Sequence, residues 1–69
     1  MKRMTREREA KNLSRTKLGY GSLVHPSRIG SIENGRVLPY PVELGRIAAA
    51  LEWEGDPELL LEEVDDHAG

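Results

Sequence analysis

The sequence predicts an all-α domain, a compact bundle of four to five short helices. One segment places Leu44, Ile47, Ala48 and Leu51 at positions i, i+3, i+4 and i+7, which is the apolar stripe of an amphipathic helix. No stretch shows the alternation of apolar and polar residues that a half-buried strand requires. Residues that favour helix starts also recur along the chain. Together these observations indicate helices joined by short loops.

Two helices are expected before residue 23. Residues 3–12 are rich in Arg, Glu, Lys and Ala, which are good helix formers, and Asn12 can end that helix. Ser14 is a strong N-cap residue and begins a short second helix. We expect Gly19 and especially Gly21 to weaken or stop this second helix, because glycine loses more backbone entropy than other residues.

The third helix is indicated by Pro26, since proline is favoured at the first helical position, and His25 is then its cap. His25 is also a candidate for contact with a phosphate or a base. Ile29 and Ile32 face the core, and Gly35 closes the helix as a residue that tolerates a left-handed conformation. After a loop over residues 36–41, a fourth helix carries the apolar stripe and is expected to end near residue 53.

A fifth helix is predicted near the end of the sequence. Asp56, Pro57 and Glu58 suit an N-cap, a first helical position and a first-turn acid. This helix would carry residues 59–61 and Val64 before an acidic tail. Trp53 is expected to pack it onto the bundle, with a dimer contact as the alternative. The leucines at 59–61 suggest a surface for a second copy or a partner.

Composition limits the kind of site this chain can hold. Sixty-nine residues form one domain, and the absence of cysteine removes disulfides and thiolate metal sites. His25 and His67 stand far apart, so we expect no metal and no cofactor. No apolar run approaches the roughly 20 residues that cross a bilayer, and no secretory signal region follows Met1, which predicts a cytoplasmic protein without a membrane partner. No arrangement typical of a catalytic site is present, so no enzyme is expected.

Charge is unevenly distributed along the chain. The net charge is −2, but residues 1–51 hold all ten Lys and Arg with four acids, a net charge of +6. Residues 52–69 hold eight acids and neither Lys nor Arg. The basic part suits a nucleic-acid face. The acidic part is open to three interpretations: a solvated end, a segment that orients binding by repelling DNA, or a segment that recruits a basic partner.

The second and third helices have the spacing of a helix-turn-helix, joined through residues 21–24. In that motif the second member enters the major groove, which makes residues 25–34 the recognition helix. With Ile29 and Ile32 buried, its outward positions are Ser27, Ser31 and Asn34. Ser27 and Ser31 are candidates for base contact, and Arg28 for a bidentate contact with guanine.

The pattern over residues 4–51 resembles the Cro/XRE-type helix-turn-helix family, which comprises phage repressors and related bacterial regulators. The positions that carry the resemblance are Arg8 to Ser14, Leu18, Val24, Ile29, Ile32 to Gly35, Pro39, Leu44, Ile47, Ala48 and Leu51. The resemblance implies a lambda-repressor-like fold, with residues 1–54 as the DNA-binding core and residues 55–69 as a short helix and tail of the same domain.

Several roles follow from the resemblance. Arg8 and Glu33 occupy places where the family forms a partly buried ion pair. Candidate phosphate contacts are Arg15, Thr16, Asn34 and Arg36. Two positions depart from the family pattern. Leu23 replaces a left-handed glycine, which favours an earlier helix end at Gly21, and Gly30 lies within the recognition helix, at a cost of roughly 1 kcal/mol relative to Ala.

These features predict a sequence-specific transcriptional regulator, a repressor that binds double-stranded DNA as a homodimer. Two-fold operators would place half-sites about 34 Å apart. The alternative is a protein-interaction module, such as an antitoxin whose acidic C-terminal segment binds a basic partner, because one fold supports several functions. The two are compatible in one protein.

Overall fold

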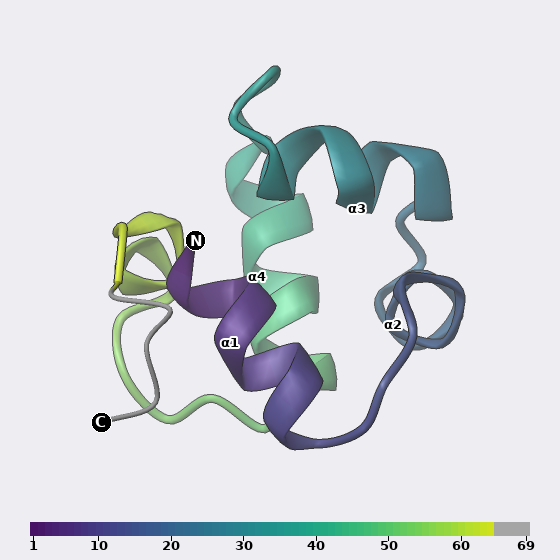
Figure 1. Ribbon diagram of the computed structural model, residues 1–69, viewed down its shortest axis with the longest axis horizontal. Coiled ribbons are helices and arrows are strands. Elements are labelled where there is room, and N and C mark those ends of the chain that lie inside the picture. Colours follow the sequence, from purple (N-terminus) through teal and green to yellow (C-terminus); the bar gives the residue numbers. More distant parts are fainter. Residues whose placement is uncertain (65–69) are drawn as a thin grey trace.

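The computed structural model describes residues 1–64 of the chain, and the predicted all-α class is confirmed over them. Four α-helices are followed by one 3-10 helix; they are α1 (Arg3–Ala10), α2 (Arg15–Ser22), α3 (Pro26–Glu33), α4 (Pro41–Ala50) and η1 (Pro57–Leu61). In Figure 1, α2 is seen nearly end-on, whereas the axes of α3 and α4 lie close to the plane of the view, so α2 is steeply inclined to both. The N-terminus and η1 lie on the left of this view, and α2 lies on the right.

The predicted apolar positions form the core. The buried apolar side chains are Met4, Leu18, Val24, Ile29, Ile32, Leu44, Ile47, Ala48, Leu51 and Leu60. Every helix contributes to this list, and η1 does so through Leu60, which packs the end of the described chain against α1 and α4. Trp53 is half-buried against the same cluster, and its indole Nε1 donates to the backbone oxygen of Asp56 at 3.0 Å.

Helix starts follow the predicted signals. The Ser14 side chain accepts a hydrogen bond from the backbone N of Lys17 at 3.0 Å, and His25 Nδ1 accepts one from Ser27 N at 3.1 Å. Gly35 has φ +75°, the left-handed conformation expected after α3. Helix ends fall earlier than predicted: α1 ends at Ala10 and α4 at Ala50.

The expected early end of α2 at Gly21 is wrong, because α2 continues through both glycines to Ser22. Leu23 itself adopts the left-handed conformation, with φ 59° and ψ 32°. Its cost is offset from α4, where Arg46 donates to the backbone oxygens of Ser22 and Leu23 at 2.8 and 3.3 Å. A guanidinium at this end satisfies carbonyl groups that the helix leaves open and is favoured by the helix dipole.

The predicted fifth helix is also corrected. It is a 3-10 helix that ends at Leu61, and Val64 is not part of it. Residues 62–64 instead run antiparallel to residues 1–3, with Arg3 N donating to Glu62 O and Val64 N to Met1 O, both at 2.8 Å. This pairing draws residue 62 into an extended conformation and so ends the helix. It is an isolated bridge, and residues 1–64 contain no sheet.

Candidate nucleic-acid interface

Helices α2 and α3 follow one another in the chain and are joined by residues 23–25. Their close approach depends on Gly19, which sequence reasoning treated as a helix breaker. A Cβ at this position would lie 2.7 Å from the backbone oxygen of Val24 and 3.0 Å from Pro26 Cγ. No side chain fits at such distances, so the glycine lets the start of α3 pack directly on α2. The sequence signal for this role was a glycine in the helical turn that precedes the predicted connection at residues 21–24.

The side of α3 that faces away from the core is polar. Ile29 and Ile32 are fully buried, whereas Ser27 and Asn34 are exposed and Ser31 is partly exposed. Ser27 Oγ lies 2.8 Å from His25 Nδ1, so its hydroxyl belongs to the same cap as the backbone. The exposed short side chains at residues 27 and 34 leave the two ends of α3 open to a partner.

The side chain of Glu33 joins three helices. Arg8 donates to it through Nε at 2.8 Å and Nη2 at 3.3 Å, and Arg15 donates through Nε at 2.9 Å. The Glu33 side chain is 1% exposed, Arg8 10% and Arg15 47%. The structure therefore contains the ion pair that the resemblance implied, with Arg15 as an additional partner that sequence reasoning missed.

Gly30 makes room for that additional partner. A Cβ at this position would meet Arg15 Nη1 at 3.5 Å and Cζ at 3.8 Å, so the arginine lies across the bare backbone of α3. Within residues 1–64, Arg15 spends its Nε on Glu33 and makes no other hydrogen bond through its side chain. Its terminal amino groups thus keep their donors for a further acceptor.

Arg28 lies in a fork with Glu43 on α4. Its Nε and Nη2 donate to the two carboxylate oxygens at 2.6 and 2.8 Å, and its guanidinium lies 5.2 Å from the ring centroid of Tyr40. Glu43 also accepts from Tyr40 N at 2.8 Å, which caps α4. The hydrogen bonds from Arg28 hold the pKa of Glu43 below its usual value, against the opposing effect of burial. Arg28, a candidate base contact, is thus a tie between α3 and α4.

Cations at the N-terminus are neutralised by the acidic segment. Glu63 lies 3.4 Å from the terminal amine and 3.3 Å from Lys2 Nζ, and Glu62 lies 3.4 Å from Arg3. The hydrogen bond from Lys2 lowers the pKa of Glu63. These pairs remove part of the expected +6 charge, and they occupy two acids of the tail. Asp65 and Asp66, also assigned to that tail, lie outside the described residues.

Other cations form no ion pair within residues 1–64. The basic residues that form no ion pair within residues 1–64 are Arg6, Lys11, Lys17, Arg36 and Arg46, of which Arg46 is spent on α2. Lys17 lies on α2, and Arg36 follows α3 closely. Thr16, Asn34 and Arg36 are all exposed, as candidate phosphate contacts need to be.

No family model, curated protein or solved structure matches this chain. The described residues hold no cluster of three or more metal-ligating side chains, and His67 lies beyond them. No helix among them is long and apolar enough to cross a membrane.

Proposed function

We propose that this chain is a sequence-specific DNA-binding regulator of the Cro/XRE type, which acts as a repressor and binds operator DNA as a homodimer. The observation that carries the proposal is the α2–turn–α3 unit, which is packed through Gly19. Its outward face carries short polar side chains, of which Ser27 and Asn34 are exposed and Ser31 is partly exposed. A helix presented this way suits the major groove, because serine side chains let the backbone approach base edges.

Roles follow from position and from what each side chain already binds. Ser27 and Ser31 contact bases. Thr16, Asn34 and Arg36 contact phosphates at the two ends of the DNA major groove, and Arg15 contacts phosphate through its free amino groups. Arg28 holds α3 against α4 through Glu43, and a contact with guanine would require that fork to open.

The test is selection of a preferred duplex from a random library, followed by fluorescence anisotropy over a series of salt concentrations. We expect a preference of at least about 10³-fold over random duplex and an affinity that falls steeply with salt. Two-fold symmetry in the selected site, with half-sites about 34 Å apart, would support a dimer. Weak and equal binding to both duplexes would refute the proposal.

Variants separate the assigned roles. Ser31→Ala should change base preference at one position, whereas Arg36→Ala should weaken binding to every duplex and reduce the salt slope by about 1. Lys2→Gln is the matched control, because Glu63 already neutralises Lys2, and its salt slope should stay unchanged. Arg28→Ala distinguishes the two roles of that residue: a uniform loss indicates positioning, and a changed preference indicates base contact.

A further inference from the structure

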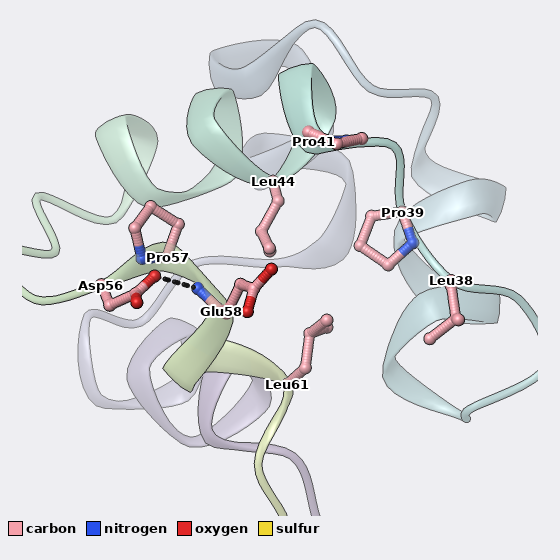
Figure 2. Close-up of a pocket in the computed structure, with 8 residues that line it drawn as sticks. All are labelled: Leu38, Pro39, Pro41, Leu44, Asp56, Pro57, Glu58 and Leu61. Atoms are coloured by element: carbon pink, nitrogen blue, oxygen red, sulfur yellow. Dashed lines mark hydrogen bonds between the residues drawn. The ribbon is translucent and has the colours of Figure 1, made fainter.

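A groove lies between the α3–α4 loop and η1, on a different part of the surface from the polar face of α3. Its volume is about 560 Å³. The loop and α4 supply one wall through Leu38, Pro39, Pro41 and Leu44, and η1 supplies the other through Pro57 and Leu61 (Figure 2). This volume falls within the range of roughly 300–1,000 Å³ that small binding pockets occupy.

The groove is preformed and apolar. Three of its lining residues are prolines, whose fixed φ angles leave little backbone freedom to lose when a ligand binds. Leu38 is 79% exposed, although it is a large apolar side chain. An occupant that covered Leu38 would gain apolar burial without first rearranging the protein.

The charge of the groove is negative. Asp56 and Glu58 complete its lining, and no Lys or Arg lines it. Figure 2 shows the Glu58 side chain extending from η1 toward the space between the walls, while Asp56 Oδ1 accepts from Glu58 N. Residues 47–64 carry six acids and neither Lys nor Arg. Two of these acids, Glu62 and Glu63, pair with cations at the N-terminus, and the other four form no ion pair within residues 1–64, so the surrounding field is also negative. This field repels nucleic acid and attracts cations.

We propose that this groove binds a short segment of a partner protein in which apolar side chains alternate with Arg or Lys. The apolar walls bury the first kind of side chain, and Asp56 and Glu58 pair with the second. Because η1 lies on the opposite side of the molecule from α2 in Figure 1, an occupied groove leaves α2 accessible. The site does not depend on the proposed function, since it uses neither the exposed side chains of α2 nor those of α3.

The experiment is a titration of the full chain with three blocked peptides of equal length. One alternates Arg and Leu, one alternates Glu and Leu, and one alternates Arg and Ser. The fluorescence of Trp53 reports binding, because this single tryptophan bonds to the backbone of Asp56 at the groove. We expect saturable binding of the Arg–Leu peptide, and binding of each of the other two that is at least about tenfold weaker, because each lacks one of the two recognition elements.

Variants at the groove locate the binding. Asp56→Asn with Glu58→Gln should weaken the Arg–Leu peptide roughly two- to thirtyfold, the range that two exposed ion pairs provide. Asn retains the cap of η1, so the fold is preserved. Leu38→Ser should weaken it about tenfold through lost apolar burial. Glu54→Gln and Val42→Ser are matched controls, because both residues are exposed and neither lines the groove.

Three results would overturn the proposal. The first would be that the Arg–Leu peptide does not bind at about millimolar concentration, since a Kd of that size corresponds to roughly −4 kcal/mol. The second would be that the Glu–Leu peptide binds as tightly as the Arg–Leu peptide, which would make the groove a general apolar surface. The third would be a dimer in sedimentation that Leu38→Ser dissociates and Val42→Ser does not, which would make a second copy the occupant. An Arg36→Ala protein that binds every duplex more weakly but binds the Arg–Leu peptide unchanged would keep the two functions distinct.

Discussion

Replacing Glu33 tests whether the buried ion-pair cluster determines the stability of this domain. Glu33→Gln preserves the shape of the side chain but removes the buried carboxylate that faces Arg8, at a site where the side chains of Glu33 and Arg8 are 1% and 10% exposed. Breaking a buried pair in this way costs about 3–5 kcal/mol. A domain of this length has a free energy of unfolding of roughly 3.5–10 kcal/mol. The variant should therefore lose about a third of its stability or more.

The chain offers a matched control on the same arginine. Glu9 lies 3.8 Å from Arg8 Nη2, but its side chain is 56% exposed, so Glu9→Gln should cost less than about 1 kcal/mol. Both variants remove one carboxylate from Arg8 and differ in burial. Urea unfolding, followed by Trp53 fluorescence and helical circular dichroism, measures the two costs.

The result that refutes this reasoning is a Glu33→Gln variant no less stable than Glu9→Gln. A rescue adds a second check. Replacing a buried pair with apolar residues of similar size is often neutral or stabilising. Arg8→Met combined with Glu33→Met should therefore recover much of the loss. A double variant as unstable as Glu33→Gln would show that the hydrogen bonds of Arg8, including that to Leu13 O at 2.7 Å, matter more than its charge.

Three further predictions follow from single positions. Gly19→Ala should lower the free energy of unfolding by about 1–3 kcal/mol, because the added Cβ would overlap Val24 O. Gly45→Ala, whose Cβ meets nothing within 4 Å, should raise it by about 0.5–1 kcal/mol, and equal effects of the two variants in thermal melts would contradict the close packing at Gly19. Leu23→Gly should raise the melting temperature, since the left-handed conformation costs Leu about 1–2 kcal/mol, and a lower value would indicate that the exposed side chain contributes packing. Arg28 lowers the pKa of Glu43, so the contribution of Glu43 to stability is complete above the unfolded-state pKa of about 4.3 and is lost as the pH falls through the lower native value. Glu43→Gln should therefore flatten the loss of stability in acid, measured by urea titrations on both sides of that pH. An unchanged dependence of stability on pH in acid would show that the Arg28–Glu43 pair is not its source.

Local signals in the sequence predicted most of the fold. Helix caps at Ser14, His25 and Asp56 depend on residues two or three positions away, and the apolar stripe of α4 depends on helical periodicity alone. Features that depend on distant residues were not predictable in this way. Leu23 is left-handed, and Arg46 of α4 donates to its backbone oxygen and to that of Ser22. The helix at residue 57 stops at Leu61 because residues 62–64 pair with the N-terminus. Both features involve contacts with residues far away in the sequence, which local sequence patterns do not predict.

The same distinction explains what happened to the candidate site. The polar face of α3 was predictable, since Ser27, Ser31 and Asn34 occupy the positions that the buried isoleucines leave free. The ion-pair partner of each arginine was not predictable, because a guanidinium binds whichever carboxylate the fold brings within reach. Two acids within the basic part, Glu33 and Glu43, lie buried and connect α3 to α1, α2 and α4 instead of adding negative charge at the surface.

The position of α3 is therefore set by carboxylates that do not belong to its exposed face. One fork binds its last residue and the other binds Arg28 near its start, so both ends of the helix are fixed before any ligand arrives. Preorganisation of this kind reduces the ordering cost of association. It also makes Glu43 a residue whose loss should weaken DNA binding without any contact to DNA. Charge counted along the sequence cannot separate such acids from those that repel a phosphate, and only their burial does.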